Sequence, residues 1–292
     1  MKNQINLTGK TIFITGAAGF IGANLAKHVI REDSAVKVVG LDNMNTYYDV
    51  RLKELGRYAN FTFVKGDLAD KELIDSLFKK HHFAVVVNLG AQAGVRYSIT
   101  NLDVYVRSNL IGFYNILEAC RHFPVEHLVY TSRSSVYGDN KKVPFSTEDK
   151  VDNPVSLYAA TKKSDRLMTH AYSKLYDIPS TGLFFTVYGS AGRLDMAYCG
   201  FMNKLLAGDT TKIFNYGSFQ RDFTYVDDIV EDIARIMQGA PALETGEDGL
   251  PVPPYAAVQY QRRTPGEPVR FRDNPVGGAG SCWHARGLAQ VC

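Results

Sequence analysis

Several features that would assign this chain to a special class are scarce. Its 292 residues include only four cysteines and one tryptophan, and 33 basic residues are nearly balanced by 30 acidic ones, for a net charge of +3. This balance does not favour nucleic-acid binding through bulk electrostatics. The cysteines (Cys120, Cys199, Cys282 and Cys292) show no metal-ligand spacing and no dense disulfide framework, which favours a reducing compartment and predicts no metal site.

Long apolar runs are also missing. No stretch approaches the roughly 20 residues that span a bilayer, and the short polar lead before residue 11 lacks the regions of a signal peptide. We therefore expect a soluble, cytoplasmic protein with neither a membrane nor a nucleic acid as partner. The length allows two domains, or one large α/β domain with a smaller appendage, and 45% hydrophobic residues suffice for a sizeable core.

Apolar, β-branched runs alternate with amphipathic segments through the first two thirds of the chain. The predicted strands are 11–15, 36–41, 62–65, 84–89, 127–131 and 180–185, and the predicted helices include 21–31, 71–80, 106–121 and 157–175. Short, almost wholly apolar strands separated by helices predict an α/β fold, a doubly wound parallel sheet with both faces covered.

Three glycines follow the first predicted strand as G-x-x-G-x-x-G. Gly16 permits a tight turn, Gly19 lets the backbone approach a pyrophosphate, and Gly22 lets the following helix pack on the strand. The helix N-terminus then offers free N–H groups and a positive dipole end to the phosphates. With the strand before it and the helix after it, the triplet predicts a dinucleotide site.

Acidic and small residues after later strands extend this predicted site. Asp42, at the end of the second strand, is expected to accept hydrogen bonds from the adenosine ribose and to repel a 2′-phosphate, which favours NAD over NADP. Asp67 and Leu68 follow the third strand, and small residues after the fourth let the cofactor cross the sheet edge. The cofactor-binding residues expected from these positions and their neighbours are Gly16, Gly19, Phe20, Ile21, Gly22, Asp42, Asn43, Asp67, Leu68, Leu89, Gly90, Ala91, Gln92 and Ser132.

A Tyr-x-x-x-Lys pair begins the helical segment 157–175. Tyr158 and Lys162 are four residues apart and so lie on one helix face. A neighbouring ammonium stabilises a phenolate, which lets the tyrosine act as general base or acid. The third participant should be a hydroxyl at the end of the fifth strand, where residues 130–138 offer several; spacing alone does not choose among them.

Together these motifs resemble a known family, the extended short-chain dehydrogenase/reductases, and within it the UDP-glucuronate 4-epimerases of bacterial capsule and envelope pathways. The resemblance runs from about residue 9 to 255. It rests on residues 16–22, 91–98 (A-Q-A-G-V-R-Y-S), 134–138, 158–162, 184–189, 192–193, 195–198 (D-M-A-Y) and 213–228, which include R-D-F-T-Y-V-D-D.

The resemblance implies roles for further residues and an assembly. Asn109 supports the nicotinamide ribose region, Tyr188 borders the nicotinamide, and Tyr158 and Lys162 also contact the cofactor. Arg193 and Arg221 hold the UDP pyrophosphate and Arg96 lies near the sugar; the alternative for each arginine is a solvated surface charge. Helices 106–121 and 157–175 resemble the pair that forms a homodimer, but core packing explains their apolar stripes equally well.

The chain also departs from the family pattern. Arg133 stands where the family places a catalytic Ser or Thr, with Ser134 as the nearest substitute, and an arginine between Leu183 and Phe184 is absent. Residues 190–196 keep Arg193 but lose its rigid, aromatic surroundings.

The tail departs most. Beyond about residue 257 it has no hydrophobic period, and a one-base shift of permitted codons restores a family-like sequence. We therefore expect a frameshift in the gene or its sequencing, which resequencing the coding DNA would test. The expected domains are an NAD-binding Rossmann domain (1–189), a partial substrate-binding lobe interleaved with it (190–255) and an out-of-frame, poorly ordered tail (256–292).

The expected function is NAD-dependent C4 epimerisation of a UDP-sugar, UDP-glucuronate to UDP-galacturonate, through a 4-keto intermediate. A non-catalytic NAD-binding fragment or pseudoenzyme is the alternative from a different class. UDP-glucuronate decarboxylase and UDP-glucose 4-epimerase activities also stay open, whereas Ser134-Ser135 argues against a 4,6-dehydratase, which requires an Asp-Glu pair there.

Overall fold

A parallel sheet lies at the centre of the molecule. The computed structural model describes residues 2–44, 49–94, 97–132, 152–190, 192, 197–210 and 224–259. Within these residues the sheet has seven strands in the order β13-β7-β6-β5-β2-β3-β4, all paired in parallel. They are β2 (Thr11–Thr15), β3 (Lys37–Asp42), β4 (Phe61–Lys65), β5 (Val85–Asn88), β6 (His127–Thr131), β7 (Ser180–Phe184) and β13 (Tyr255–Gln259). The order reverses between β2 and β5, which confirms the predicted doubly wound Rossmann-type sheet.

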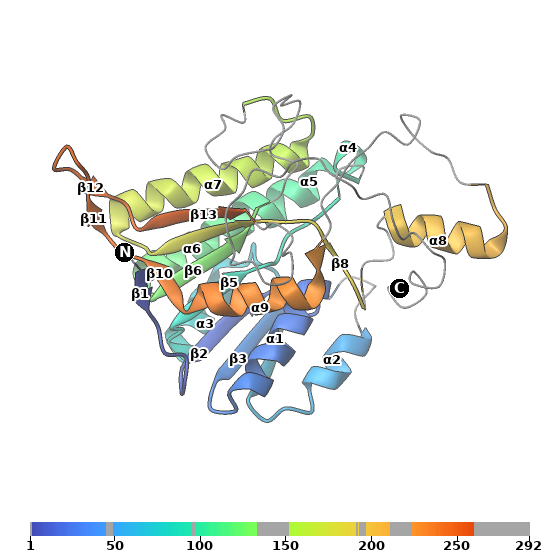
Figure 1. Ribbon diagram of the computed structural model, residues 1–292, viewed down its shortest axis with the longest axis horizontal. Coiled ribbons are helices and arrows are strands. Elements are labelled where there is room, and N and C mark those ends of the chain that lie inside the picture. Colours follow the sequence, from blue (N-terminus) through green and yellow to red (C-terminus); the bar gives the residue numbers. More distant parts are fainter. Residues whose placement is uncertain are drawn as a thin grey trace, which may run out of the picture.

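Helices cover both faces of this sheet (Figure 1). One face carries α1 (Phe20–Glu32), α2 (Asp49–Leu55) and α9 (Val226–Met237); the other carries α3 (Lys71–His81), α6 (Gly112–His122) and α7 (Leu157–Tyr176). Two short helices, α4 (Tyr97–Thr100) and α5 (Leu102–Tyr105), and a π-helical segment, Val106–Ile111, precede α6. This arrangement explains why the strands are apolar at nearly every position, since both of their faces are buried.

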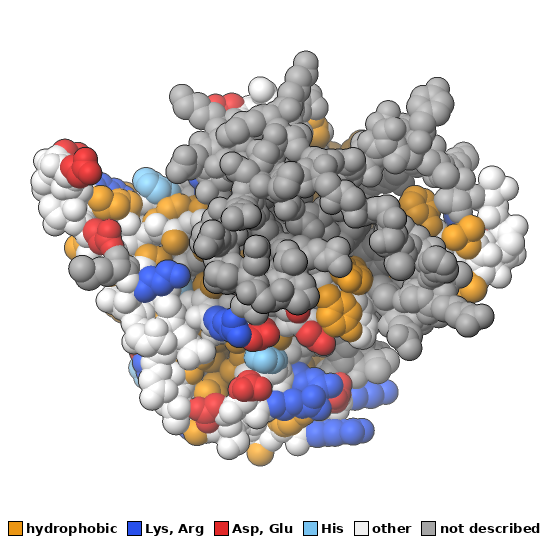
Figure 2. Space-filling model, viewed as in Figure 1, with side chains coloured by type: hydrophobic (Ala, Val, Ile, Leu, Met, Phe, Trp, Pro, Cys, Tyr) orange, Lys and Arg blue, Asp and Glu red, His pale blue; other side chains and the backbone are white. Residues whose placement is uncertain are grey.

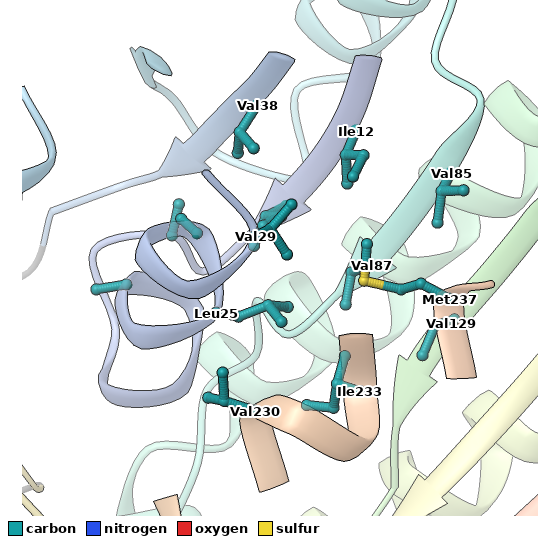
Figure 3. Close-up of a cluster of buried hydrophobic side chains, with 14 of the residues drawn as sticks. Ile12, Leu25, Val29, Val38, Val85, Val87, Val129, Val230, Ile233 and Met237 are labelled. Carbon is teal, nitrogen blue, oxygen red and sulfur yellow. The ribbon is translucent and has the colours of Figure 1, made fainter. Parts of the chain in front are cut away.

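Most of the buried apolar side chains of the central strands belong to two hydrophobic clusters, one on each face of the sheet. Ile12 and Ile14 of β2 join the cluster under α1 and α9, while Phe13 between them joins the one under α3 and α6. Figure 3 shows the first cluster, in which Val85 and Val87 of β5 face side chains of α1 and α9. Burying each Val, Ile or Phe in this way contributes about 1.5–3 kcal/mol.

Three small sheets and one outlying helix complete the described structure. Strand β1 (Lys2–Gln4) pairs antiparallel with β10 (Gly239–Pro241), β8 (Val187–Tyr188) pairs parallel with β9 (Thr224–Tyr225), and β11 (Glu244–Thr245) pairs antiparallel with β12 (Pro251–Val252). Helix α8 (Ala197–Ala207) lies away from the sheet (Figure 1). The space-filling view shows hydrophobic side chains on this helix at the surface (Figure 2), among them Phe201, Leu205 and Leu206.

The predicted strands and helices agree with the structure to within one residue at their ends, with one exception. The run 106–121 was predicted as a single α-helix, but it begins with the π-helical segment and becomes α-helical only at Gly112. The buried side chain of this segment is that of Asn109, which bonds to the Gln92 loop and to Thr161.

Two findings concern the last third of the chain. Helix α9, in the region expected to form a substrate lobe interleaved with the Rossmann domain, packs against α1 on the Rossmann sheet. The tail does not begin at residue 256, because residues 256–259 belong to β13, with Ala257 paired to Gly182 and Val258 to Leu183. Strand pairing uses backbone groups, so a short run without a clear hydrophobic period can still form an edge strand. Residues 260–292 lie outside the described residues.

Candidate active site

A cavity opens at the carboxyl ends of the central strands, beside the reversal between β2 and β5. In α/β sheets this is the place where ligands bind, because the loops on either side diverge there. The cavity is lined by Gly16, Gly19, Phe20, Ile21, Gly22, Leu41, Asp42, Asn43, Gly66, Asp67, Leu68, Leu89, Gly90, Ala91, Gln92, Ala93, Ser108, Thr131, Ser132, Tyr158, Lys162, Phe185 and Val187.

The glycine loop between β2 and α1 forms one wall of this cavity. Gly16 has φ +67°, and a Cβ there would lie 2.9 Å from the Gly90 backbone nitrogen. A Cβ on Gly19 or Gly22 would lie 2.9 or 2.2 Å from the Gly16 carbonyl oxygen. Each glycine of the motif is therefore sterically required, and the loop presents bare backbone at the start of α1, where the first N–H groups have no intrahelical acceptor.

Asp42 stands at the end of β3 and faces the same loop. Its carboxylate oxygens accept hydrogen bonds from the backbone N–H groups of Ala18 (3.1 Å) and Met44 (3.0 Å). Burial raises the pKa of Asp42 above its usual value, and these N–H bonds act in the opposite direction. Because each carboxylate oxygen has more than one lone pair, the side chain can still accept bonds from ribose hydroxyls.

Hydrogen bonds between side chains and backbone fix the loop that follows β5. The Thr15 hydroxyl donates to Asn88 Oδ1 (2.7 Å) and accepts from the Gly90 N–H (2.9 Å), joining the ends of β2 and β5. Asn109 Oδ1 accepts from the Gln92 N–H (2.8 Å), while its Nδ2 donates to the Gln92 carbonyl (3.1 Å) and to Thr161 Oγ1 (3.0 Å). Asn109 thus joins the cavity wall to α7.

Helix α7 brings the Tyr-Lys pair to the cavity. The Ser156 hydroxyl caps the helix by accepting from the Ala159 N–H (3.1 Å), so Tyr158 lies in the first turn. Tyr158 is buried, and the edge of its ring meets the ring of Tyr105 with centroids 5.7 Å apart. Tyr158 and Lys162 both line the cavity, as the spacing of four residues predicts.

The Lys162 ammonium has two partners inside the protein. Nζ donates to the Thr131 carbonyl at the end of β6 (3.2 Å) and to Asp165 Oδ2 (3.0 Å). Asp165 is buried, and its desolvation raises its pKa to about 6 even though the ammonium favours the carboxylate. A lysine has three N–H donors, so one remains for a ligand in the cavity.

Ser132 is a further polar residue of the cavity wall. Its hydroxyl is buried and has no hydrogen-bond partner among the described residues. A buried polar group without a partner is costly, so a hydroxyl in this position is suited to a bound ligand.

The structure brings most of the predicted cofactor residues together. All of those derived from the glycine loop and the strand ends, including Ser132, line the cavity, as do Tyr158 and Lys162. Asn109 and Tyr188 do not: Asn109 lies behind the Gln92 loop, and the Tyr188 ring packs against Tyr225 (centroids 5.5 Å apart). The predicted residues Arg96, Ser134, Arg193 and Arg221, together with Arg133, lie outside the described residues.

Sequence reasoning missed other residues of this site. Leu41, Gly66, Ala93, Ser108, Thr131, Phe185 and Val187 line the cavity without having been predicted. Leu41, Gly66 and Thr131 adjoin residues that were, so position at a strand end could have identified them. Asp165 belongs to no motif; its spacing of three residues from Lys162 on α7 allows the contact, but only the structure shows that both side chains are buried.

The described cavity fits a dinucleotide. The bare backbone of the glycine loop suits a pyrophosphate, Asp42 suits a ribose, and the unpartnered Ser132 hydroxyl and the remaining Lys162 donor suit the other end of such a ligand. Among the described residues no His, Cys, Asp and Glu side chains gather in a metal-binding group. No helix in the described part of the chain is long and apolar enough to cross a membrane.

Comparisons with known proteins give a consistent result. Residues 12–248 match the model of the NAD dependent epimerase/dehydratase family. Protein CapI of Staphylococcus aureus is 48% identical over 271 residues, which cover 90% of this chain and 80% of that protein. UDP-glucuronate 4-epimerase 4 of Arabidopsis thaliana is 46% identical over 250 residues, which cover 82% of this chain and 56% of that protein.

A solved structure is similar along most of its length. The UDP-glucuronic acid 4-epimerase from Bacillus cereus, crystallised in complex with UDP-glucuronic acid and NAD, superposes with a TM-score of 0.73 at 30% identity. The match covers 85% of this chain and 76% of that one.

Proposed function

Because the chain belongs to the NAD dependent epimerase/dehydratase family, whose cofactor is NAD, we propose that it interconverts UDP-glucuronate and UDP-galacturonate by epimerisation at C4. One observation carries the proposal: Tyr158 and Lys162 line the same cavity as the glycine loop and Asp42. A proton-transfer group therefore lies beside the expected position of the nicotinamide. The similarity to relatives that carry this activity in their names supports the choice of sugar.

The residues of the cavity have different roles in this reaction. The glycine loop and Asp42 bind and orient the cofactor, which supplies the hydride acceptor and donor at C4. Tyr158 takes the proton of the C4 hydroxyl and returns it once the 4-keto sugar has presented its other face. Lys162 stabilises the phenolate of Tyr158 and binds the nicotinamide ribose with its remaining N–H donor.

The polar groups around the substrate are also part of the proposal. Ser134 is the candidate hydroxyl between sugar and tyrosine. Arg193 and Arg221 are the candidates for the UDP pyrophosphate, and Arg96 for the sugar. These roles rest on the sequence resemblance. A cytoplasmic enzyme with this activity would supply a sugar nucleotide for polysaccharide synthesis.

The activity is tested by incubating the purified chain with UDP-glucuronate and NAD and separating the products by chromatography. We expect UDP-galacturonate to form, and Tyr158→Phe to lower kcat by about 10²–10⁴-fold, the usual contribution of a general acid–base group. Tyr172→Phe is the matched control. Tyr172 lies on the same helix, but its hydroxyl donates to Glu118 and it does not line the cavity.

Two outcomes would contradict the proposal. NAD binding without turnover of any UDP-sugar would favour the non-catalytic, dinucleotide-binding alternative for this chain. Release of carbon dioxide with formation of a UDP-pentose would favour the decarboxylase alternative.

We also propose a homodimer formed by α7 and the helical run that ends in α6. Large apolar side chains are exposed on both: Ile111 (47%) and Tyr114 (44%) on the run, Leu167 (61%) and Leu175 (68%) on α7. The two helices pack against each other, so a partner could cover all four side chains at once. Large exposed apolar side chains on neighbouring helices favour association.

A further inference from the structure

Asp165 forms an unusual buried ion pair with Lys162. It lies three residues further along α7, and the exposed fractions of the two side chains are 3% for Lys162 and 1% for Asp165. Oδ2 accepts from Nζ at 3.0 Å, whereas Oδ1 has no hydrogen-bond partner among the described residues. A carboxylate buried in this way is poorly compensated, so the pair is not explained by stability alone.

The position of the pair matters more than its strength. Lys162 is the cation of the cavity that the proposed function uses to stabilise the Tyr158 phenolate and to bind the nicotinamide ribose. An ammonium with a carboxylate 3.0 Å away acts on its surroundings as a dipole, and its field a few ångströms further on is much weaker than that of a lone charge. Asp165 therefore opposes the contribution that Lys162 makes.

We propose that Asp165 is a positioning residue that moderates Lys162, so that the site binds NAD less tightly and reacts more slowly when Asp165 is ionised than when it is neutral. The inference rests on the proposed function, which supplies the role of Lys162. The inference adds that Asp165, a residue that does not line the cavity, limits how strongly Lys162 acts.

The surroundings of Asp165 support this assignment. Lys162 is the cation that faces it, and from β6 it faces the buried phenol of Tyr130, whose hydroxyl pairs with that of Tyr255 on β13. The helical elements packed on α7 also carry charged or phenolic groups. Glu118 bonds to Tyr172, Arg107 to Asp67, and Tyr105 to the Gly94 carbonyl; α4 and α5 also carry Tyr97 and Asp103. Strand β7 contains no titratable side chain.

This environment makes the effect of Asp165 on Lys162 depend on pH. Burial raises the pKa of Asp165 to about 6, so the carboxylate is ionised at pH 7.5 and largely protonated at pH 5. A neutral Asp165 leaves the ammonium charge unopposed, and an asparagine should do the same at every pH.

The test measures NAD binding by isothermal titration calorimetry at pH 5 and pH 7.5, without substrate. At pH 7.5 we expect Asp165→Asn to bind NAD about threefold more tightly than the wild type, because its hydrogen bond from Lys162 to the ribose is more strongly charge-assisted. At pH 5 the two proteins should converge. The ratio of the two dissociation constants reports on Asp165 alone, because any effect of Asp42 on NAD binding is the same in both proteins.

Asp75→Asn is the matched control. Asp75 on α3 also pairs with a lysine of its own helix, Lys71, and also has one buried oxygen without a partner. Its substitution should leave NAD affinity unchanged at both pH values. With UDP-glucuronate, Asp165→Asn should raise kcat/KM about tenfold at pH 7.5 and have little effect at pH 5.

A double-mutant cycle shows whether the effect passes through Lys162. In the Lys162→Met background, Asp165→Asn should no longer tighten NAD binding. If Asp165→Asn fails to fold, the NAD affinities of the wild type and Lys162→Met still test the proposal. The wild type should bind NAD more tightly than Lys162→Met by a factor that grows as the pH falls through 6. A factor that does not change with pH would overturn the proposal.

Weaker or unchanged NAD binding by a folded Asp165→Asn protein at pH 7.5 would also overturn it, because Asp165 would then hold Lys162 in place or have no influence. These binding results do not require turnover. Failure of the epimerase assay in every variant would therefore count against the proposed function and leave this inference to be decided by the NAD affinities.

Discussion

Two buried titratable side chains have pKa values displaced in opposite senses, and both bear on stability. His127 on β6 lies with Nδ1 3.3 Å from the Met237 carbonyl and Nε2 2.8 Å from Thr181 Oγ1. A carbonyl only accepts, so Nδ1 carries the proton and Nε2 accepts from the threonine. Burial lowers the pKa of His127 to about 4, whereas burial raises that of Asp165 to about 6.

The signs of their effects on unfolding follow from which state binds the proton first. As the pH falls below 6.5, His127 becomes protonated in the unfolded chain but not in the folded protein, so the stability present above pH 6.5 is lost by pH 4. As the pH falls below 6, Asp165 becomes protonated in the folded protein but not in the unfolded chain, so stability is gained down to pH 3.8. Each displacement corresponds to about 3 kcal/mol, and between pH 6 and 4 the two effects nearly offset each other.

Substituting either residue alone should therefore change the pH dependence of the free energy of unfolding, and the two changes should be opposite in sign. Relative to the wild type, His127→Gln should gain about 3 kcal/mol in free energy of unfolding between pH 6.5 and 4, and Asp165→Asn should lose about as much between pH 6 and 3.8. Urea unfolding at a series of pH values measures both. Curves that stay parallel to the wild type would show that these groups titrate alike in the folded and unfolded states.

At this scale the sequence identified residues that belong to motifs. Gly16, Asp42, Tyr158 and Lys162 were predicted from spacing and lie at one cavity. Asp165 and His127 could not be identified in this way. The pKa values of both are displaced mainly by burial, and the partners of His127 lie on other elements; a titratable side chain in a sequence indicates neither.

At the scale of elements, the π-helical segment Val106–Ile111 joins the two halves of the site. It holds Asn109 inside, where three hydrogen bonds reach the Gln92 loop and Thr161 of α7. π-Helical turns are often found at functional sites, since they reorient one side chain within a helix. The hydrophobic period of 106–121 predicted a helix but gave no indication of this local change, because the apolar stripe continues through it.

Asn109→Ala should uncouple the loop from α7. Leaving the buried partners without bonds is expected to lower the free energy of unfolding by about 1–3 kcal/mol and to weaken NAD binding, since Gln92 lines the cavity. Thermal unfolding and calorimetry measure the two effects.

Ser173→Ala is the matched control for that experiment. Ser173 on α7 is also buried, but its hydroxyl donates to the Ile178 carbonyl, and neither residue lines the cavity. It should lower stability with a smaller change in NAD affinity. Equal losses of affinity in both variants would mean that Asn109 acts only through general stability.

At the scale of the whole molecule, the sheet and its two helical layers hold the site rigidly, while one outer surface remains apolar. Leu167→Glu should convert the proposed dimer to a monomer, because it places a charge in a buried apolar contact. Light scattering after size-exclusion chromatography gives the mass directly.

Leu206→Glu is the matched control, since Leu206 on α8 is exposed to 73% and lies away from α6 and α7 (Figure 1). It should leave the mass unchanged. A wild-type protein that is monomeric at micromolar concentration would contradict the proposed interface.

The sequence by itself determined the fold class, the positions of the central strands and many of the residues that line the cavity. These features depend on local patterns: apolar runs at strand length, glycines that no other residue can replace, and a pair at helical spacing. Only the tertiary structure decided which face each strand residue occupies, that residues 224–259 return to the Rossmann sheet through α9 and β13, and that Asp165 and Lys162 are both buried. Those outcomes depend on contacts between segments far apart in the chain or on burial, and neither is encoded in any short stretch of sequence.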